Sequence, residues 1–215
     1  MLRKTAIVLG LAMALLATPA SAANINFLDS FWRPDSPQTF TRSLSYLGAE
    51  WAGVTLTVTS VPTNIYWDNT DGYGVTGGIN DQIDHQEALV FTFNRPVLLQ
   101  SVGITDLFHR SHDHPYIEKG YYTVDLGAPQ LFEAVPGQVV GSTNGVANPD
   151  LGGQQGTTLT FTAFNPKSQV PHEHHDYSVS SINATLIAQT PEPATLLLFG
   201  SALFGGAFFR RRRHA

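Results

Sequence analysis

Two histidine clusters contain the residues of this sequence best suited to bind a transition metal. The stretches FHRSHDHPY (108–116) and PHEHHDY (171–177) each hold an H-x-H pair. The paired residues are His112 with His114 and His172 with His174. Alternate residues of an extended segment point to one side, so each pair can offer two imidazoles to one zinc or copper ion. Loop histidines that only gain charge below about pH 6.5 are the competing interpretation.

A second candidate metal site is an acidic, glycine-rich stretch, WDNTDGYGVTGGINDQIDHQE (67–87), whose oxygen atoms suit Ca²⁺. The carboxylates that can bind the ion are Asp68, Asp71, Asp81, Asp84 and Glu87. Their spacing is not that of an EF-hand. Asp and Asn beside Gly are also ordinary turn residues, so solvated turns explain the composition equally well. Ca²⁺ and Zn²⁺ or Cu²⁺ are therefore hypotheses, and no cofactor is required.

Sequence motifs of known catalytic and nucleotide-binding sites do not support an enzymatic function. Gly72, Gly74 and Gly77 match G-x-G-x-x-G as text, but no helix is expected after them, so they predict no phosphate site. The sequence contains neither G-x-S-x-G nor G-x-x-x-x-G-K. We therefore predict a non-catalytic protein. The alternative is a metal-dependent extracytoplasmic hydrolase, or a metal-binding protein, that uses the histidine pairs.

Alternation of apolar and polar residues is the main periodicity between the two ends of the chain. In TLTVT (55–59), Leu56 and Val58 alternate with threonines, and TTLTFTAF (157–164) repeats the pattern, which predicts half-buried strands. Further strands are expected at 88–93, 97–108, 120–126 and 176–188, with a turn at Asn94–Pro96 and a bulge near Ser180–Ser181. Short strands without helices between them predict an all-β, antiparallel, jelly-roll-like β-sandwich over residues 23–189.

The N-terminal residues have the order of a secretory signal peptide. Arg3 and Lys4 precede an apolar run, 5–17, which is followed by the small residues Ala20, Ser21 and Ala22. We predict cleavage after Ala22, so that residues 1–22 are removed. The sequence has no cysteine, so the exported domain depends on burial and backbone pairing instead of disulfides.

Charge is divided unequally along the chain. Residues 23–193 contain six Lys or Arg against seventeen Asp or Glu, a net charge of −11. The remaining cations lie near the two ends and bring the whole chain to −5. An acidic body repels phosphate groups, so nucleic acid is not an expected partner.

Three consecutive segments form the C-terminal end. Pro191-Glu192-Pro193 is followed by an uncharged segment, 194–209, and by a basic end, 210–215. The basic end begins with Arg210, Arg211, Arg212 and Arg213. As a helix the uncharged segment spans about 24 Å, somewhat less than the ~30 Å hydrocarbon core of a bilayer. By the positive-inside rule the arginines stay cytoplasmic, which agrees with export of the body and predicts one membrane helix before processing.

This order of motif, hydrophobic helix and basic end resembles the PEP-CTERM sorting signal, here 190–215, of exported proteins in Gram-negative bacteria. The resemblance implies that an exosortase, a membrane protease-transpeptidase, handles the tail. It also implies a route from the inner membrane to the cell surface, the outer envelope or the extracellular matrix. Many family members accompany exopolysaccharide production, so exopolysaccharide is an expected partner. Residues 70–185 more loosely resemble ectodomains found before such tails, which implies no activity.

Aromatic residues of the body are candidates for weak glycan contacts. The four residues considered are Trp32, Trp51, Tyr66 and Trp67. Each combines an apolar ring with a polar atom, which suits an exposed binding surface, but the same rings also suit a hydrophobic core. The favoured function is an exported, non-catalytic protein of the cell surface or the exopolysaccharide matrix.

Overall fold

The structure is a computed structural model that describes six stretches of the chain. These are residues 22–76, 82–84, 86–108, 117–135, 145–164 and 175–187. Contacts group Ser21–Ile187 into one compact unit, the body of the protein. Within the six stretches, no helix is long and apolar enough to cross a membrane. The expected signal peptide, 1–22, lies outside the described residues except for Ala22, and the whole C-terminal segment, 190–215, lies outside them.

The described residues form eleven β-strands and three short 3₁₀ helices. The strands are β1 (Ala22–Asn26), β2 (Thr39–Ser43), β3 (Thr55–Val61), β4 (Ile65–Asp68), β5 (Gly72–Val75), β6 (Ala88–Thr105), β7 (Lys119–Val124), β8 (Gln130–Glu133), β9 (Val146–Ala147), β10 (Asp150–Ala163) and β11 (Ser178–Leu186). The 3₁₀ helices are η1 (Ser30–Trp32), η2 (Ser45–Leu47) and η3 (Ala49–Trp51). Every pairing between these strands is antiparallel. The prediction of an all-β protein is confirmed.

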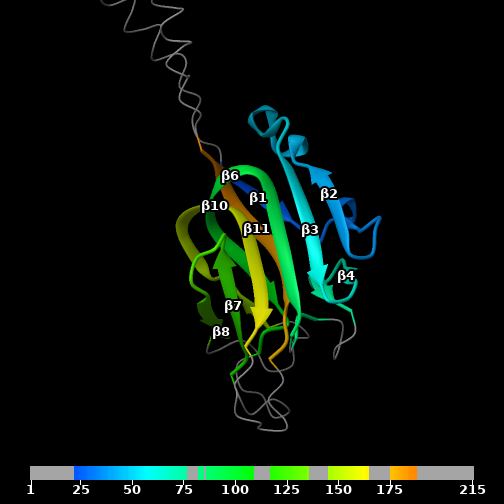
Figure 1. The fold of residues 1–215 in the computed structure, drawn as a ribbon, viewed down its shortest axis with the longest axis vertical. Coiled ribbons are helices and arrows are strands. Elements are labelled where there is room, and N and C mark those ends of the chain that lie inside the picture. The colour runs from blue at the N-terminus through cyan, green and yellow to red at the C-terminus, as the bar shows by residue number, and fades with distance from the viewer. Residues whose placement is uncertain are drawn as a thin grey trace, which may run out of the picture. The chain divides into compact units, whose positions relative to one another are not determined.

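The long strand β6 belongs to two parts of one hydrogen-bonded sheet (Figure 1). Its first part, 88–93, lies between β3 and the second part of β10, and this region continues to β2 on one side and to β7 and β8 on the other. Its second part, 97–105, lies between β11 and the first part of β10 or β9. Strands β1, β5 and β4 extend that region beyond β11. We call these regions the first and second half-sheets.

The turn expected at Asn94–Pro96 is wrong as a strand boundary, because β6 continues through these residues. Thr92 and Val97 of β6 pair with Thr158 and Gly156 of β10. Between these two pairs β6 has more residues than β10, so β6 bends there. The Asn94 side chain fixes the bend by accepting a hydrogen bond from Thr55 N and donating one to Gly53 O, both at 2.9 Å. The segment Asn94–Pro96 resembles a turn in sequence, but the hydrogen bonds of the Asn94 side chain hold it within one strand.

The alternating pattern predicted for the strands is confirmed. Leu56 and Val58 of β3 are fully buried, and Leu159 and Phe161 of β10 are as well, while the threonines between them are partly exposed. On the outer face, threonine hydroxyls pair between β2 and β3 at 2.8 and 3.0 Å. The predicted bulge is also present, because the register between β11 and β6 shifts between Val179 and Ser181.

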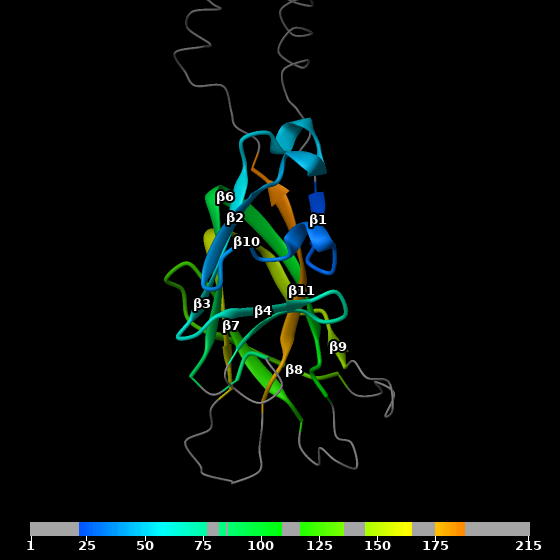
Figure 2. The same ribbon diagram turned by 90° about the vertical axis from the view of Figure 1, so that its right-hand side faces the viewer.

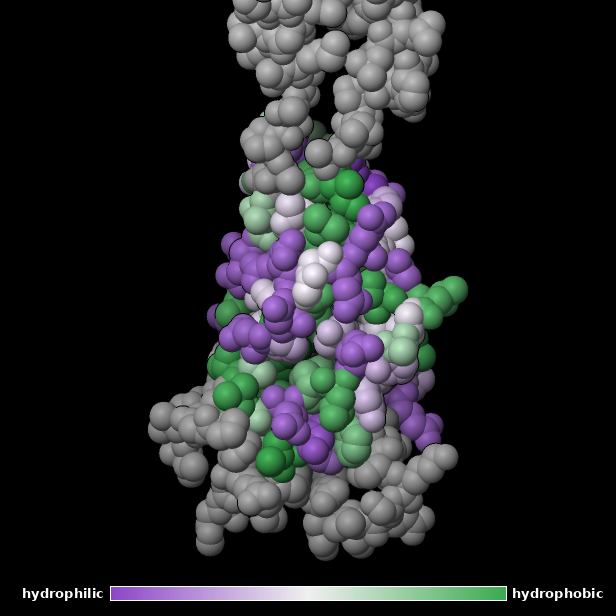
Figure 3. Space-filling view, turned by 90° about the vertical axis from the view of Figure 1, so that its left-hand side faces the viewer, coloured by the Kyte–Doolittle hydropathy of each residue, from purple (hydrophilic) through white to green (hydrophobic). Residues whose placement is uncertain are grey.

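Aromatic rings from the two half-sheets meet in the core. Phe91 of the first half-sheet stacks on Phe27, which follows β1, with ring centroids 5.1 Å apart. The Phe91 ring also lies 6.2 Å from the ring of Tyr73 in β5 and 5.8 Å from that of Phe161 in β10. Since Phe27 and Tyr73 belong to the second half-sheet, these contacts join the two half-sheets through one hydrophobic core. The side of the body with β7 and β8 shows small polar and apolar areas intermixed (Figure 3).

We predict that Phe91→Ala lowers the free energy of unfolding by about 3–5 kcal/mol, because it leaves a cavity at the contact between the half-sheets. The neighbouring Thr92, exposed on the opposite face of β6, provides the matched control. Thr92→Ala should change the free energy by no more than about 0.5 kcal/mol. Urea denaturation of both variants measures the difference, and equal effects would contradict the assigned core.

Candidate functional site

A pocket of about 360 Å³ opens between one loop and the edge strand β4. Its lining consists of the loop residues 33–37 and of residues 65–67 in β4. In Figure 2, β2, β3 and β4 lie toward the viewer, and β4 runs crosswise to the other two. The pocket therefore lies where the segment that leads into β2 meets the outermost strand of the second half-sheet.

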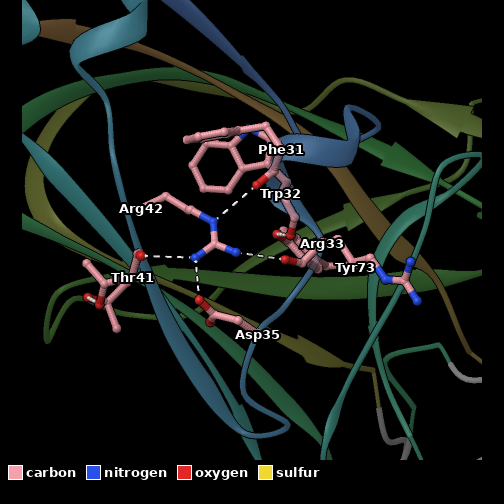
Figure 4. A network of polar contacts seen from close by, with 8 residues as sticks. Phe31, Trp32, Arg33, Asp35, Thr41, Arg42 and Tyr73 are labelled. Carbon is pink, nitrogen blue, oxygen red and sulfur yellow. Dashed lines mark hydrogen bonds and ion pairs between the residues drawn. The ribbon is translucent and has the colours of Figure 1, made fainter.

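The guanidinium of Arg42, in β2, holds the loop in place (Figure 4). Its Nε donates to the carbonyl of Phe31 at 3.1 Å, and one terminal nitrogen donates to the carbonyl of Arg33 at 2.8 Å. The other terminal nitrogen forms an ion pair with Asp35 at 2.9 Å. The hydrogen bond from Arg42 lowers the pKa of the Asp35 carboxyl. One side chain thus holds this segment through the backbone carbonyls of Phe31 and Arg33 and through the carboxylate of Asp35.

Further contacts attach this loop to the core and to β4. The Tyr73 hydroxyl donates a hydrogen bond to the carbonyl of Trp32, and the backbone N–H of Ile65 donates to the carbonyl of Pro37. The Arg42 guanidinium also lies over the ring of Phe40, 5.0 Å from its centroid, which is a cation–π geometry. The loop is therefore anchored at its start, its middle and its end, so the pocket is preformed.

Successive residues of β4 give the other wall of the pocket its two aromatic rings. The Trp67 indole packs against the core, and its Nε1 donates to the carbonyl of Phe27 at 2.6 Å. Side chains alternate along a strand, so Tyr66 points away from the face on which Trp67 packs. The Tyr66 hydroxyl lies 3.3 Å from a carboxylate oxygen of Asp68 on the same side. Tyr66 and Trp67 both line the pocket, and the half-buried Tyr66 lies on the face of β4 opposite the one through which Trp67 packs against the core.

The other two aromatic candidates are core residues. Trp32 and Trp51 are 1% and 0% exposed, and Trp32 packs edge-on against Phe27 at 5.1 Å. Of the four aromatic residues singled out from the sequence, the structure places Tyr66 and Trp67 together at the pocket and assigns Trp32 and Trp51 to the interior. The lining of the pocket thus combines aromatic residues of β4 with the polar residues Arg33 and Ser36 of the loop.

The histidine pairs lie outside the described residues, so His112, His114, His172 and His174 remain predictions as transition-metal ligands. The neighbouring His175 is described, and it is buried with its ring edge-on to Phe164 at 5.2 Å.

The calcium candidates separate into two local turns. Asp68 Oδ1 accepts hydrogen bonds from the backbone N–H groups of Thr70 and Asp71, each at 2.7 Å. The Glu87 carboxylate accepts from the Asp84 N–H at 3.0 Å. Asp81 lies outside the described residues. In the described part of the chain, no group of three or more His, Asp or Glu is arranged to hold a metal ion. Calcium binding remains a prediction.

A cluster of buried carboxyl groups that sequence analysis did not identify lies near Asp71. The pKa of Glu118 is raised to about 9, chiefly by burial and also by the nearby Asp176 and Asp106, against a hydrogen bond donated by Phe108 N that lowers it. Burial likewise raises the pKa of Asp106 to about 6, with contributions from Asp71. No sequence signal indicates this cluster, because its members come from four separate segments. At neutral pH Glu118 is therefore protonated in the folded protein.

We predict that the protein becomes less stable as pH rises, and that Glu118 causes the change above pH 6.5. The folded pKa of about 9 exceeds the ordinary Glu value of 4.5, so folding takes up a proton, and this contribution to stability is lost as pH rises through the folded pKa. The midpoint of thermal unfolding should fall from pH 6.5 to 9. Glu118→Gln should flatten this dependence, while Glu133→Gln, an exposed control, should retain it. An unchanged slope in Glu118→Gln would exclude this assignment.

Comparisons with known proteins identify the C-terminal end. The PEP-CTERM protein-sorting motif matches residues 189–213. A solved X-ray structure, GH31 CBM32-2 bound to GalNAc, is 14% identical to this chain and covers 79% of it and 99% of the other chain, with a TM-score of 0.24. A likeness this low carries no argument about the fold or the ligand of this protein. The curated proteins contain no match.

The match agrees with the order of residues at this end, where Pro191-Glu192-Pro193 precedes the uncharged segment and the arginines. Such a tail indicates an exported, membrane-transiting protein of Gram-negative bacteria, with an exosortase as its processing partner. The chain is thus an exported, exosortase-sorted protein that carries a PEP-CTERM sorting motif at residues 189–213.

Proposed function

We propose that this protein is a non-catalytic glycan-binding protein of the cell surface or the exopolysaccharide matrix. In this proposal the body is a jelly-roll-like β-sandwich, and the pocket between the 33–37 loop and β4 binds a sugar residue. The protein requires no cofactor for this function. The single observation that carries the proposal is the preformed pocket with an aromatic wall and polar rim.

The chemistry of a pyranose ring suits this pocket. A sugar ring has C–H faces, which pack on an aromatic ring, and hydroxyl groups around its edge, which need hydrogen-bonding partners. Tyr66 supplies the ring, while Ser36 and Arg33 supply polar groups at the rim. Because Arg42 and Tyr73 already order the loop, little conformational entropy is lost on binding.

The lining of the pocket favours binding over hydrolysis. Glycoside hydrolysis ordinarily uses two carboxyl groups placed on either side of the scissile bond. The described lining contains one carboxylate, Asp35, and its ion pair with Arg42 keeps it engaged with the loop. The hydroxyl of Ser36 has no histidine or lysine beside it in that lining. These residues support a binding role.

The sorting tail supports the proposed location. An exosortase substrate passes through the inner membrane and leaves it after processing, which brings the body to the outside of the cell. There the expected partner of the body is exopolysaccharide. Cleavage after Ala22 leaves Ala23–Asn26, which pair with Ala184–Ser181 of β11, so removal of the signal peptide keeps nearly all of β1 in the sheet.

We predict that Tyr66→Ala lowers glycan affinity at least tenfold, because it removes the ring against which the sugar packs. The full chain in a nonionic detergent would be applied to a glycan array, and the affinity for the best glycan would be measured by calorimetry. Tyr121→Ala is the matched control, since Tyr121 is a half-buried tyrosine of β7 that contacts Phe164 and does not line the pocket. Equal loss in both variants, or full binding by Tyr66→Ala, would contradict the proposed site.

We also predict that the surface-released protein lacks residues 1–22 and the tail beyond Pro191-Glu192-Pro193. The intact mass of the protein recovered from the native host measures both cleavages. Replacing the three motif residues with alanine should leave the uncharged segment and the arginines attached and retain the protein in the membrane fraction. Release of a protein that still carries Arg210 to Arg213 would count against exosortase processing.

A further inference from the structure

We propose that the pocket selects a carboxylate-bearing sugar, and that Arg33 is the residue that recognises the carboxylate. The ligand class is thus an acidic polysaccharide that contains uronic acid residues. This inference rests on the proposed glycan-binding function and narrows it to one chemical class.

Of the described cations, Arg33 and Arg95 take part in no ion pair with another described residue, and of these two Arg33 lines the pocket. The Arg42 guanidinium is committed to Asp35 and to loop carbonyls, and Lys119 forms an ion pair with Glu133 at 3.3 Å. Arg33 is exposed and lines the pocket, and among the described residues it forms no ion pair. In Figure 4 its guanidinium points away from the Arg42 network. The loop therefore presents one cation to a ligand.

The backbone of Arg33 is held by two hydrogen bonds, while the residue itself is exposed. Its carbonyl accepts the 2.8 Å hydrogen bond from Arg42, and its N–H donates to the carbonyl of Ser30 at 3.1 Å. A guanidinium on a fixed backbone is well suited to a carboxylate, because its planar fork donates two parallel hydrogen bonds to the two oxygens. Tyr66 lines the opposite wall of the pocket, so the sugar ring that carries this carboxylate can pack against it.

Nearby negative charge does not cancel this cation. Asp35 is ion-paired with Arg42, and Asp68 beside Tyr66 accepts two backbone N–H groups and the tyrosine hydroxyl. The net charge of −11 over residues 23–193 repels polyanions in general. At about 0.15 M salt the screening length is roughly 8 Å, so distant carboxylates are screened while a direct contact with Arg33 persists. Recognition of an acidic glycan must therefore come from the pocket.

The test compares polygalacturonate with its carboxyl-reduced form, which keeps the sugar backbone and loses the charge. The full chain in nonionic detergent at 0.15 M NaCl is measured against both polymers by calorimetry. We expect tighter binding of polygalacturonate, and a loss of about 10-fold or more in Arg33→Ala, the effect of one charge-assisted hydrogen-bonded contact. Arg33→Lys should bind less tightly than wild type, because it keeps the charge and loses the fork. Arg95→Ala removes the same charge from β6, away from the pocket lining, and should bind as wild type does.

The possible outcomes separate this inference from the function on which it rests. Equal affinity for both polymers, with Arg33→Ala unaffected, would overturn the inference and leave glycan binding in place. Dextran sulfate controls for general attraction to negative charge, and tighter binding of that polymer than of polygalacturonate would overturn the assignment to carboxylates. Failure to bind these polymers or any glycan of the array would overturn the proposed function itself, and the inference with it.

Discussion

The body of this protein depends on one long, bent strand. Strand β6 pairs with β3, β9, β10 and β11, so both half-sheets are hydrogen-bonded to the same backbone. Strand β6 bends at Asn94–Pro96, between the two half-sheets, and the rings of Phe27, Tyr73 and Phe91 pack together in the core that the half-sheets share. Because the chain has no disulfide to restrict its unfolded state, this aromatic contact and the shared strand supply the cohesion of the fold.

The pairing of the strands determines the position of the residues that line the pocket. Pairing of β2 with β3 places Arg42 beneath the 33–37 loop, and pairing of β4 with β5 places Tyr66 and Trp67 opposite it. The Arg42 guanidinium then satisfies two loop carbonyls and Asp35 at once, which few other side chains can do. A loop held in this way can keep Arg33 exposed without losing its backbone conformation, so the same network that stabilises the loop also presents a cation to a ligand.

In the cluster of buried carboxyl groups, burial raises the pKa of Glu118 while a hydrogen bond lowers it. Glu118 is fully buried, and only its protonated form avoids the desolvation cost of a charge in the interior. Its hydrogen bond from Phe108 N lowers the pKa, but burial and the neighbouring acids outweigh this effect. Placing Asp106, Glu118 and Asp176 close together therefore links the stability of the fold to pH without requiring any ligand.

The sequence by itself determined the strand class, the bulge near Ser180–Ser181 and the sorting motif at 189–213, because each depends on residues close together in the chain. Alternation along β3 and β10 predicts which face is buried, since neighbouring side chains point to opposite sides of a strand. Only the tertiary structure decided that β6 continues through Asn94–Pro96, that Trp32 is core, and that Tyr66 meets Arg33 at a pocket. These outcomes depend on contacts between residues thirty or more positions apart, and such contacts are set by strand pairing, which local periodicity does not specify.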